Sequence, residues 1–306
     1  MRIGLTGGAS SVDGIVRQVA RAEEEGFSSV WFPGAVGGDP LVALAIAARA
    51  TASIELGTSV LQTYTCHPGL MANRATAVVD AIGTPGRFTL GIGPSHRPLI
   101  EDVLGMSYDT PGRHTEEYLS ILTPLLRGES VDQHGAELSY TAVPPPPPGG
   151  EPVPVLLAAL GPRLLRVAGG LADGTITWMA NATAVREHVA PLLSQAAAAA
   201  GRPSPRIVVG LPVAVHDDVA AARATAAEQF AVYGTLPNYQ RILAHGGIDG
   251  PDEAAIVGDE SAVTAAVHEL LDSGATDVWA APFPVGDDPS ASRQRTRALL
   301  KELAAA

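Results

Sequence analysis

Cysteine, lysine, aromatic residues and long apolar runs are all scarce in this chain of 306 residues. The single cysteine, Cys66, excludes an internal disulfide and suits a reducing, cytoplasmic setting. The single lysine, Lys301, lies in a predicted terminal helix, which argues against a Schiff-base aldolase. No apolar run reaches membrane-spanning length, and the first five residues read as a strand rather than a signal peptide.

Basic residues are also few, with 20 lysines and arginines against 32 aspartates and glutamates. A net charge of -12 argues against nucleic acid or an anionic membrane as the main partner, so we expect a small-molecule partner. A hydrophobic content of 46% is enough for a large core, and a single domain over residues 1–306 is the simplest reading of the length.

Strand-like and helix-like segments alternate along the chain. Nearly continuous apolar strands separated by helices predict a parallel sheet covered on its outer face, and eight such units favour an α/β TIM barrel over a doubly wound sheet. The predicted strands are Arg2–Leu5, Ser29–Phe32, Ile54–Leu61, Arg87–Gly93, Val153–Leu160, Thr175–Met179, Arg206–Val215 and Asp277–Phe283. The predicted helices begin near Val12, Pro40, Leu70, Arg113, Pro162, Val185, Val219 and Ser292.

Two long insertions interrupt this alternation. Residues 129–152 follow the fourth strand and contain the rigid run Pro144–Pro148, and residues 233–259 follow the seventh strand. Because long connections in compact domains are often lids or binding loops, either one could close over a substrate. Plain surface loops are the alternative.

Carboxylates are nearly absent from the predicted strand ends, where the working residues of a barrel lie. A glycosidase needs two facing acids, and a metal-dependent hydrolase needs clustered ligands, whereas the histidines here are scattered singly. We therefore expect no metal site. A bound cofactor that carries the reaction fits these neutral strand ends best.

The turn at Gly161 and Pro162 is the most informative local pattern. Pro162 suits the first position of a helix, and the free N–H groups at such a helix start, at the carboxyl end of a strand, bind phosphate. Arg163 can add a full positive charge. The sequence thus predicts a phosphorylated cofactor at this turn.

An ordered set of short motifs resembles the luciferase-like monooxygenase superfamily, most of all its branch that uses the deazaflavin coenzyme F-420. The match spans essentially the whole chain, although each piece alone is weak. Its pieces are Gly57–Leu61, His67-Pro68, Gly86–Phe88, Leu90–Gly93, Gly112–Tyr118, Ala158–Pro162 and Leu171–Gly174.

The resemblance implies a cofactor site at the barrel mouth. It places a non-prolyl cis peptide at Ser59-Val60, behind the deazaflavin ring, although Gly57–Leu61 could also be an ordinary buried strand. It implies that backbone N–H groups of Ala158, Ala159, Leu160 and Gly161 hold the phosphate and that Gly93, Pro94 and Ser95 line the ring. Trp178 and Met179 would lie beside the ribityl and phosphate groups, or pack in the barrel core.

Two departures from the family pattern bear on the reaction. The Asp-His pair that several sugar-phosphate-oxidising members carry after the second strand is Gly34-Ala35 here, and their glutamate after the fourth strand is His96. The resemblance therefore implies reduction of an activated C=C or C=N bond in a small organic acceptor. His96 is the candidate proton donor, because imidazole titrates near neutral pH, and Tyr64 is a second candidate. Both could instead be structural.

Three functions remain open on this reading. The first is an oxidoreductase that uses coenzyme F-420, the second a reduced-FMN-dependent monooxygenase, and the third a barrel that binds a cofactor without turnover. Because some members of the superfamily associate through barrel helices, we also expect a homodimer, with the apolar second and third helices as candidate surfaces.

Overall fold

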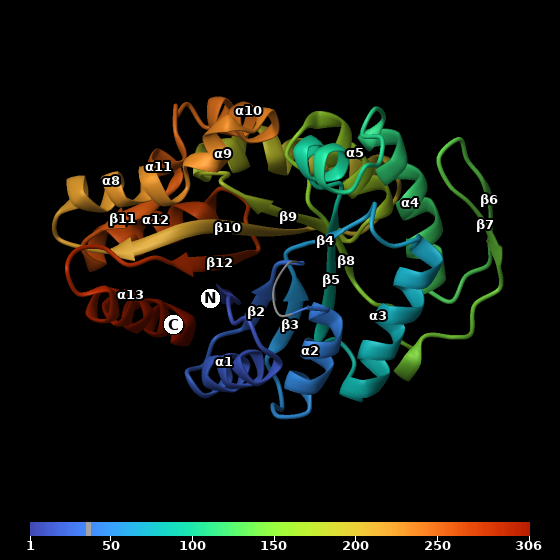
Figure 1. Ribbon diagram of the computed structural model, residues 1–306, viewed down its shortest axis with the longest axis horizontal. Coiled ribbons are helices and arrows are strands. Elements are labelled where there is room, and N and C mark those ends of the chain that lie inside the picture. Colours follow the sequence, from blue (N-terminus) through green and yellow to red (C-terminus); the bar gives the residue numbers. More distant parts are fainter. Residues whose placement is uncertain (35–37) are drawn as a thin grey trace.

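Parallel strands form a closed barrel in the computed structural model, which describes residues 1–34 and 38–306. Each of the eight barrel strands pairs with two neighbours, and the last strand pairs back to the first (Figure 1). The TIM-barrel prediction is confirmed. The barrel strands are β1 (Ile3–Thr6), β2 (Ser29–Phe32), β3 (Glu55–Thr58), β5 (Phe88–Gly93), β8 (Val155–Leu157), β9 (Gly174–Trp178), β10 (Arg206–Val215) and β12 (Asp277–Pro282).

Two short strands extend this sheet. β4 (Leu61–Gln62) pairs with β5, and β11 (Ile256–Gly258) pairs with β10, both in parallel. The predicted third strand, Ile54–Leu61, is thus divided into β3 and β4, and the break falls at Ser59-Val60. The predicted fifth strand is shorter than expected, because only Val155–Leu157 pairs regularly within Val153–Leu160.

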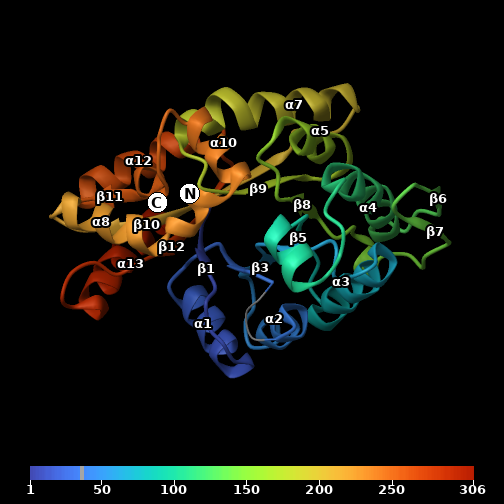
Figure 2. The same cartoon turned by 45° about the horizontal axis from the view of Figure 1, so that its top comes forward.

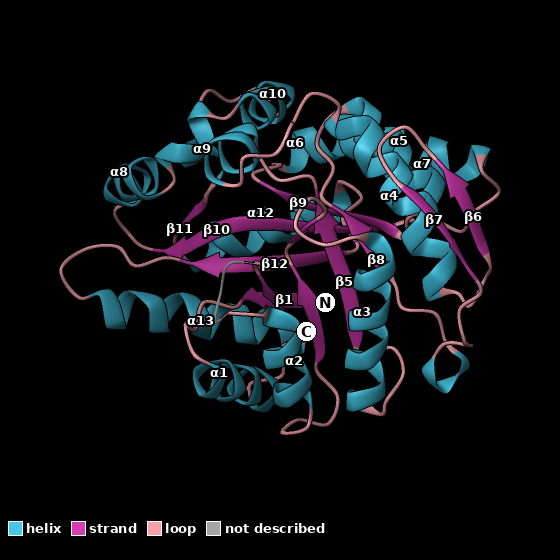
Figure 3. Cartoon of the chain, turned by 45° about the vertical axis from the view of Figure 1, so that its right-hand side comes forward, coloured by secondary structure: helices cyan, strands magenta, loops and turns pink. Residues whose placement is uncertain are grey.

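Helices surround the barrel (Figures 2 and 3). Several begin as the sequence indicates, for example where Asp39 caps the helix that starts at Pro40 by accepting from the N–H of Leu41. The covering helices are α1 (Val12–Glu24), α2 (Pro40–Ala48), α3 (Pro68–Ile82), α4 (Pro111–Leu126), α5 (Pro162–Leu171), α7 (Ala190–Ala199), α8 (Val219–Gln229), α12 (Glu260–Asp272) and α13 (Pro289–Ala305). Short helical segments at strand ends are η1 (Pro98–Val103), α6 (Ala182–Ala184) and η3 (Val185–Val189).

The first insertion forms a two-stranded hairpin on the outside of the barrel. β6 (Val131–His134) and β7 (Ser139–Ala142) pair in antiparallel fashion, and the short helix η2 (Pro148–Gly150) ends the proline run. The hairpin lies beyond α3 and α4 in both ribbon views (Figures 1 and 2). Its turn is held by Glu117 of α4, whose carboxylate accepts the N–H groups of residues 136–138.

The second insertion is largely helical and lies over the barrel near β9. It contains α9 (Ala231–Thr235), α10 (Pro237–His245) and α11 (Pro251–Ala254) before β11 (Figure 1). We refer to residues 230–245, which carry α9 and α10, as the lid segment. Its side chains reach the strand ends, as described below.

Large and small side chains alternate inside the barrel. A Cβ added at Gly57 would lie 2.2 Å from the ring of Trp31, and one at Gly210 would lie 2.0 Å from the ring of Trp279. Each indole therefore occupies space that only a glycine on the adjacent strand leaves open. Trp31 and Trp279, packed against these glycines, form a layer of side chains across the barrel interior that separates the mouth of the barrel from its opposite end.

An ion-pair network around two buried carboxylates closes that opposite, amino-terminal end. Arg206 donates to Glu55 Oε1 and to Asp277 Oδ1, both at 2.6 Å, and Arg2 donates to Asp277 Oδ1 at 2.6 Å. Burial alone would raise the pKa of the Asp277 carboxyl, but hydrogen bonds and charge from Arg206 outweigh it and lower that pKa. The polar interior at this end is thus structural.

Candidate cofactor and substrate site

The carboxyl ends of three strands meet at Val60, Gly93 and Ala158. The peptide bond between Ser59 and Val60 is cis, as predicted. A Cβ added at Gly93 would lie 2.9 Å from Val60 Cγ2 and 2.9 Å from Ala158 Cβ. Val60, Gly93 and Ala158, which are far apart in the sequence, are therefore packed together. A side chain at position 93 would overlap those of Val60 and Ala158.

The end of β2 lies against the same bulge. A Cβ added at Gly34 would lie 2.9 Å from the carbonyl oxygen of Val60. The absence of a side chain at Gly34 thus keeps the backbone of β2 close to the cis peptide. Ala35, the second residue of the Gly34-Ala35 departure, lies outside the described residues.

Two predicted site residues adopt left-handed backbone conformations. Ser95 has φ 66° and Met179 has φ 64°, values uncommon for residues other than glycine and concentrated at functional sites. The carbonyl oxygen of Ser95 accepts a hydrogen bond from the hydroxyl of Tyr108 at 2.7 Å. Met179 is fully buried, and Pro94, directly after β5, is also buried. Ser95, the next residue, is half-buried at the rim of the barrel.

The predicted phosphate turn has the expected form, with one correction. Gly161 is the N-cap residue of α5, and no side chain caps that helix, so the first N–H groups of the helix face outward without a side-chain acceptor. The N–H of Ala158, however, donates to the carbonyl oxygen of Ile92 at 2.8 Å. Of the four residues predicted to donate, Ala158 therefore already uses its N–H in the sheet.

Neighbouring side chains hold this turn in place. His188 Nε2 lies 2.8 Å from the carbonyl oxygen of Leu160, and because a carbonyl only accepts, Nε2 carries the proton. Arg163 lies 3.3 Å from Glu116 Oε2 at the start of α4, so its charge is shared with a carboxylate at an exposed position. Ala159 is fully buried next to these residues.

His96 lies under the lid segment. Its ring centroid is 5.6 Å from that of Tyr239 in α10. Burial lowers the pKa of His96 from its ordinary value, and a hydrogen bond with Asn238 opposes this in part. At neutral pH the imidazole is therefore mainly uncharged, with an N–H that can donate at the site.

Tyr64 lies in a different aromatic group. Its ring stacks on His114 with centroids 3.9 Å apart and lies 5.4 Å from Tyr108. Burial, with the charges of Glu137 and Asp109, raises the pKa of Tyr64 to about 12. The phenol therefore keeps its proton at neutral pH and is a weaker acid than free tyrosine.

The lid segment completes an aromatic series across the mouth that the sequence-based prediction did not include. Trp178 stacks on Trp279 with centroids 5.1 Å apart, Tyr233 lies 5.8 Å from Trp178, and Tyr239 lies 4.9 Å from Tyr233. In a chain with only 5% aromatic residues, two tyrosines within one long insertion were the available signal.

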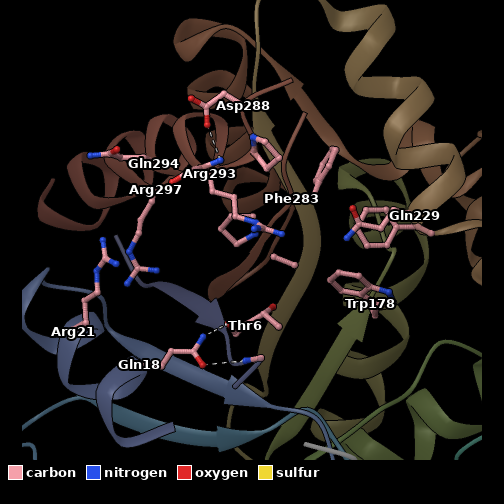
Figure 4. Close-up of a pocket in the computed structure, with 16 residues that line it drawn as sticks. Thr6, Gln18, Arg21, Trp178, Gln229, Phe283, Asp288, Arg293, Gln294 and Arg297 are labelled. Carbon is pink, nitrogen blue, oxygen red and sulfur yellow. Dashed lines mark hydrogen bonds between the residues drawn. The ribbon is translucent and has the colours of Figure 1, made fainter. Parts of the chain in front are cut away.

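A cavity of about 1030 Å³ opens beside this series, between α1, α13 and the ends of β1 and β12 (Figure 4). Among the residues predicted for the site, Trp178 is the one that lines it. Most of the other polar groups on its wall come from α1 and from α13 with its N-cap, while Thr6 lies at the end of β1 and Gln229 at the end of α8; none of them was predicted for the site.

Within the described ranges, 1–34 and 38–306, no three histidine, cysteine, aspartate or glutamate side chains are grouped so that they could hold a metal ion. No helix there is both long and apolar enough to cross a bilayer.

A family profile described as luciferase-like monooxygenase matches residues 1–299. The chain belongs to the luciferase-like monooxygenase family. The family assignment made from the motifs is thereby confirmed.

Two curated relatives of this chain have names that refer to reductase or dehydrogenase activity. The chain is 28% identical over 283 residues to a 5,10-methylenetetrahydromethanopterin reductase of Methanolobus tindarius, covering 91% of this chain and 84% of the relative. It is 30% identical over 288 residues to an F-420-dependent glucose-6-phosphate dehydrogenase of Beutenbergia cavernae, covering 90% and 80%.

Solved structures share the luciferase-like barrel at lower identity. The coenzyme F-420-dependent tetrahydromethanopterin reductase of Methanopyrus kandleri has a TM-score of 0.78 at 20% identity, covering 99% of this chain and 97% of the other. The oxygenating constituent of 3,6-diketocamphane monooxygenase from Pseudomonas putida, in complex with FMN, has a TM-score of 0.73 at 18% identity, covering 100% and 98%. At these identities the likeness establishes the fold alone.

Proposed function

We propose that this protein is an oxidoreductase that transfers a hydride between coenzyme F-420 and a small organic substrate, reducing an activated C=C or C=N bond. The observation that carries the proposal is the convergence of Val60, Gly93 and Ala158 at the carboxyl ends of three strands, beside the uncapped start of α5. The name of one curated relative, the F-420-dependent glucose-6-phosphate dehydrogenase, supports the choice of F-420.

The residues present fit such a cofactor at both of its ends. The lack of a side chain at Gly93 lets Val60 and Ala158 pack against the backbone of β5, so that the three strand ends form one surface on which a flat ring would lie. The N–H groups of Gly161, Arg163 and Leu164, at the positive end of the α5 dipole, suit a phosphate, with Ala159 and Leu160 completing the turn. When bound, F-420 would supply or accept the hydride.

The chain itself would supply orientation and a proton. His96 is the first candidate to deliver a proton to the substrate, because it lies at the mouth under Tyr239 and its protonated form, the minor one at neutral pH, is a stronger acid than ordinary histidine. Tyr64 is the second candidate, although its raised pKa makes it the weaker acid. Ser95, Trp178 and Met179 would border the cofactor.

Parallel calorimetric titrations of the purified protein with F-420 and with FMN test the proposal. We expect micromolar binding of F-420 and weaker binding of FMN. Gly93→Val should weaken F-420 binding at least tenfold, since its side chain would meet Val60 and Ala158, whereas Gly170→Ala, where an added Cβ has open space, should not. Failure of F-420 to bind at micromolar concentration would overturn the proposal.

A reduced-FMN-dependent monooxygenase is the second candidate function. The FMN complex of the diketocamphane monooxygenase, which has the same fold, favours it. Tighter binding of FMN than of F-420, together with oxygen consumption in the presence of a reductase, would decide for it. A barrel without turnover would be indicated if His96→Ala and Tyr64→Phe changed no measurable property.

We also propose a homodimer formed through α2 and α3. Three large apolar side chains on these helices are exposed, Val42 at 55%, Ile46 at 47% and Leu70 at 56%. A monomeric mass of the wild-type protein by light scattering would contradict the proposal. Ile46→Asp should shift the mass toward the monomer if this face is the interface.

A further inference from the structure

The cavity beside Trp178 is lined mainly by positive charge, although the protein as a whole is acidic. Three guanidinium groups, those of Arg21, Arg293 and Arg297, line it together with one carboxylate, that of Asp288. The whole protein, by contrast, has a net charge of -12. Figure 4 shows Arg293 and Arg297 projecting from α13 on the side that faces Gln18 and Trp178.

The ion pairs at this cavity single out one arginine. Arg21 and Arg297 both pair with the same carboxylate, Glu25, and Arg297 also lies 5.3 Å from the ring of Phe27. Asp288 is engaged as the N-cap of α13, where it accepts the N–H groups of residues 290 and 291. Arg293 has no ion-pair partner within residues 1–34 and 38–306, so its charge is the one left for a ligand.

The inner end of the cavity has a different chemistry. Trp178, Phe230 and Phe283 form an apolar, aromatic wall there, with Phe230 and Phe283 edge to face at 5.6 Å. Within the described part of the chain, the Thr6 hydroxyl is buried without a hydrogen-bond partner. A hydroxyl in this position can donate to an acceptor oxygen of a ligand. The Trp178 indole N–H is directed to Tyr233, where a hydrogen bond with Trp178 opposes the rise in the phenol pKa that burial causes.

This cavity is separate from the phosphate turn. The turn follows β8, whereas the cavity lies at the ends of β12 and β1, and β9, β10 and β12 stand between β8 and β1 in the ring of strands. An anionic group at Arg293 and the phosphate at α5 would therefore lie on opposite sides of the mouth. Trp178, between them, belongs to both regions.

We propose that this cavity is the substrate site and that it takes an organic acid with an apolar body. The acid group meets Arg293, and the apolar body lies along Phe230, Phe283 and Trp178 toward the barrel mouth. The inference names the substrate class for the proposed hydride transfer and rests on that function for its catalytic meaning. The binding itself can be tested without turnover.

Calorimetry with cinnamate and cinnamamide tests the charge requirement, because the two probes differ only in the acid group and share a conjugated C=C bond. We expect cinnamate to bind about tenfold more tightly than cinnamamide. Arg293→Gln should reduce the affinity for cinnamate about tenfold and leave that for cinnamamide within twofold. Its matched control is Arg295→Gln on the same helix, because Arg295 pairs with Asp217 and Glu260 away from the cavity.

Titration of the same variants with F-420 separates the two proposals. Arg293→Gln should bind F-420 as the wild type does. If cinnamate binds with the stated charge dependence and F-420 does not bind, the acid site stands and the proposed function fails. Equal affinity for cinnamate and cinnamamide, no binding of either, or an equal loss in both variants would overturn the acid site even where F-420 binds.

Discussion

The imidazole of His188 lies face to face with that of His245, with centroids 3.7 Å apart and planes 14° from parallel. One ring holds the carbonyl oxygen of Leu160 at the phosphate turn, and the other belongs to α10 of the lid segment. The pair therefore joins the lid segment to the turn. Because two protonated rings at this distance would repel each other, the junction requires that at least one of the two imidazoles is uncharged.

Acid should loosen this junction. Burial, together with the nearby charge of His245, lowers the pKa of His188, with the Leu160 hydrogen bond opposing them. The unfolded chain, with a histidine pKa of about 6.5, then binds the proton more readily, so the free energy of unfolding should fall as pH drops through that value. Urea unfolding of the wild type and His245→Asn at pH 7.5, 6.5 and 5.5 should give a shallower pH dependence for the variant. Identical slopes would contradict this.

Removing the arginine at the closed end of the barrel should be costly. Arg206→Met leaves the buried carboxylates of Glu55 and Asp277 paired with the half-exposed Arg2 alone, so the cost should lie toward the lower end of the about 3–5 kcal/mol typical of a broken buried ion pair. The difference in the free energy of unfolding between the wild type and Arg206→Met should shrink as pH falls below about 4. The lowered pKa of Asp277 stabilises the wild type only at pH values where this carboxyl is ionised in the folded protein. Urea titrations at pH 7 and pH 3.5 measure both effects. Arg295→Gln, at an exposed pair, should change stability far less.

Steric fit inside the barrel can be tested with two glycine substitutions. Gly210→Ala would place a methyl group 2.0 Å from the ring of Trp279, and overpacking of this kind typically costs about 1–3 kcal/mol. Gly170→Ala in α5 meets no atom within 4 Å and should stabilise by up to about 1 kcal/mol through helix propensity. Thermal unfolding of both variants should therefore shift in opposite directions. A shift in the same direction would argue against the packing account.

The lid segment should control the titration of His96. Tyr239→Ala removes the ring that helps to bury the imidazole, so the lowered pKa of His96 should rise toward its ordinary value. Tyr239→Phe keeps the ring and should leave that pKa unchanged. Proton NMR of the histidine Cε1–H signals over pH 5–8 measures both, with the His96 signal assigned from His96→Gln. An unchanged pKa in Tyr239→Ala would mean that other groups bury His96.

Local patterns carried most of the fold prediction. Each predicted barrel strand has a counterpart, because apolar runs bounded by glycine and proline mark buried parallel strands clearly. The sequence analysis predicts no helix over Glu260–Asp272, where the structure has α12. Its signals are local and present in the sequence, because Asp259 caps the helix and Val263, Val267 and Leu270 repeat at helical spacing.

The candidate site was predicted less completely than the fold. Motif resemblance located the cis peptide at Ser59-Val60, which lies within one short segment. It could not locate the approach of Tyr239 to His96 or the arginines of α13 beside Trp178. These contacts join segments more than 100 residues apart, and only the closure of the barrel brings them together.

All three tryptophans of this protein lie in the barrel interior or at its mouth, where Trp178 stacks on Trp279 and touches Tyr233. The outer helices contribute none. The intrinsic ultraviolet emission of the protein therefore originates where ligands are proposed to enter, and a shift in its wavelength on adding a ligand would report events at the mouth without any attached dye.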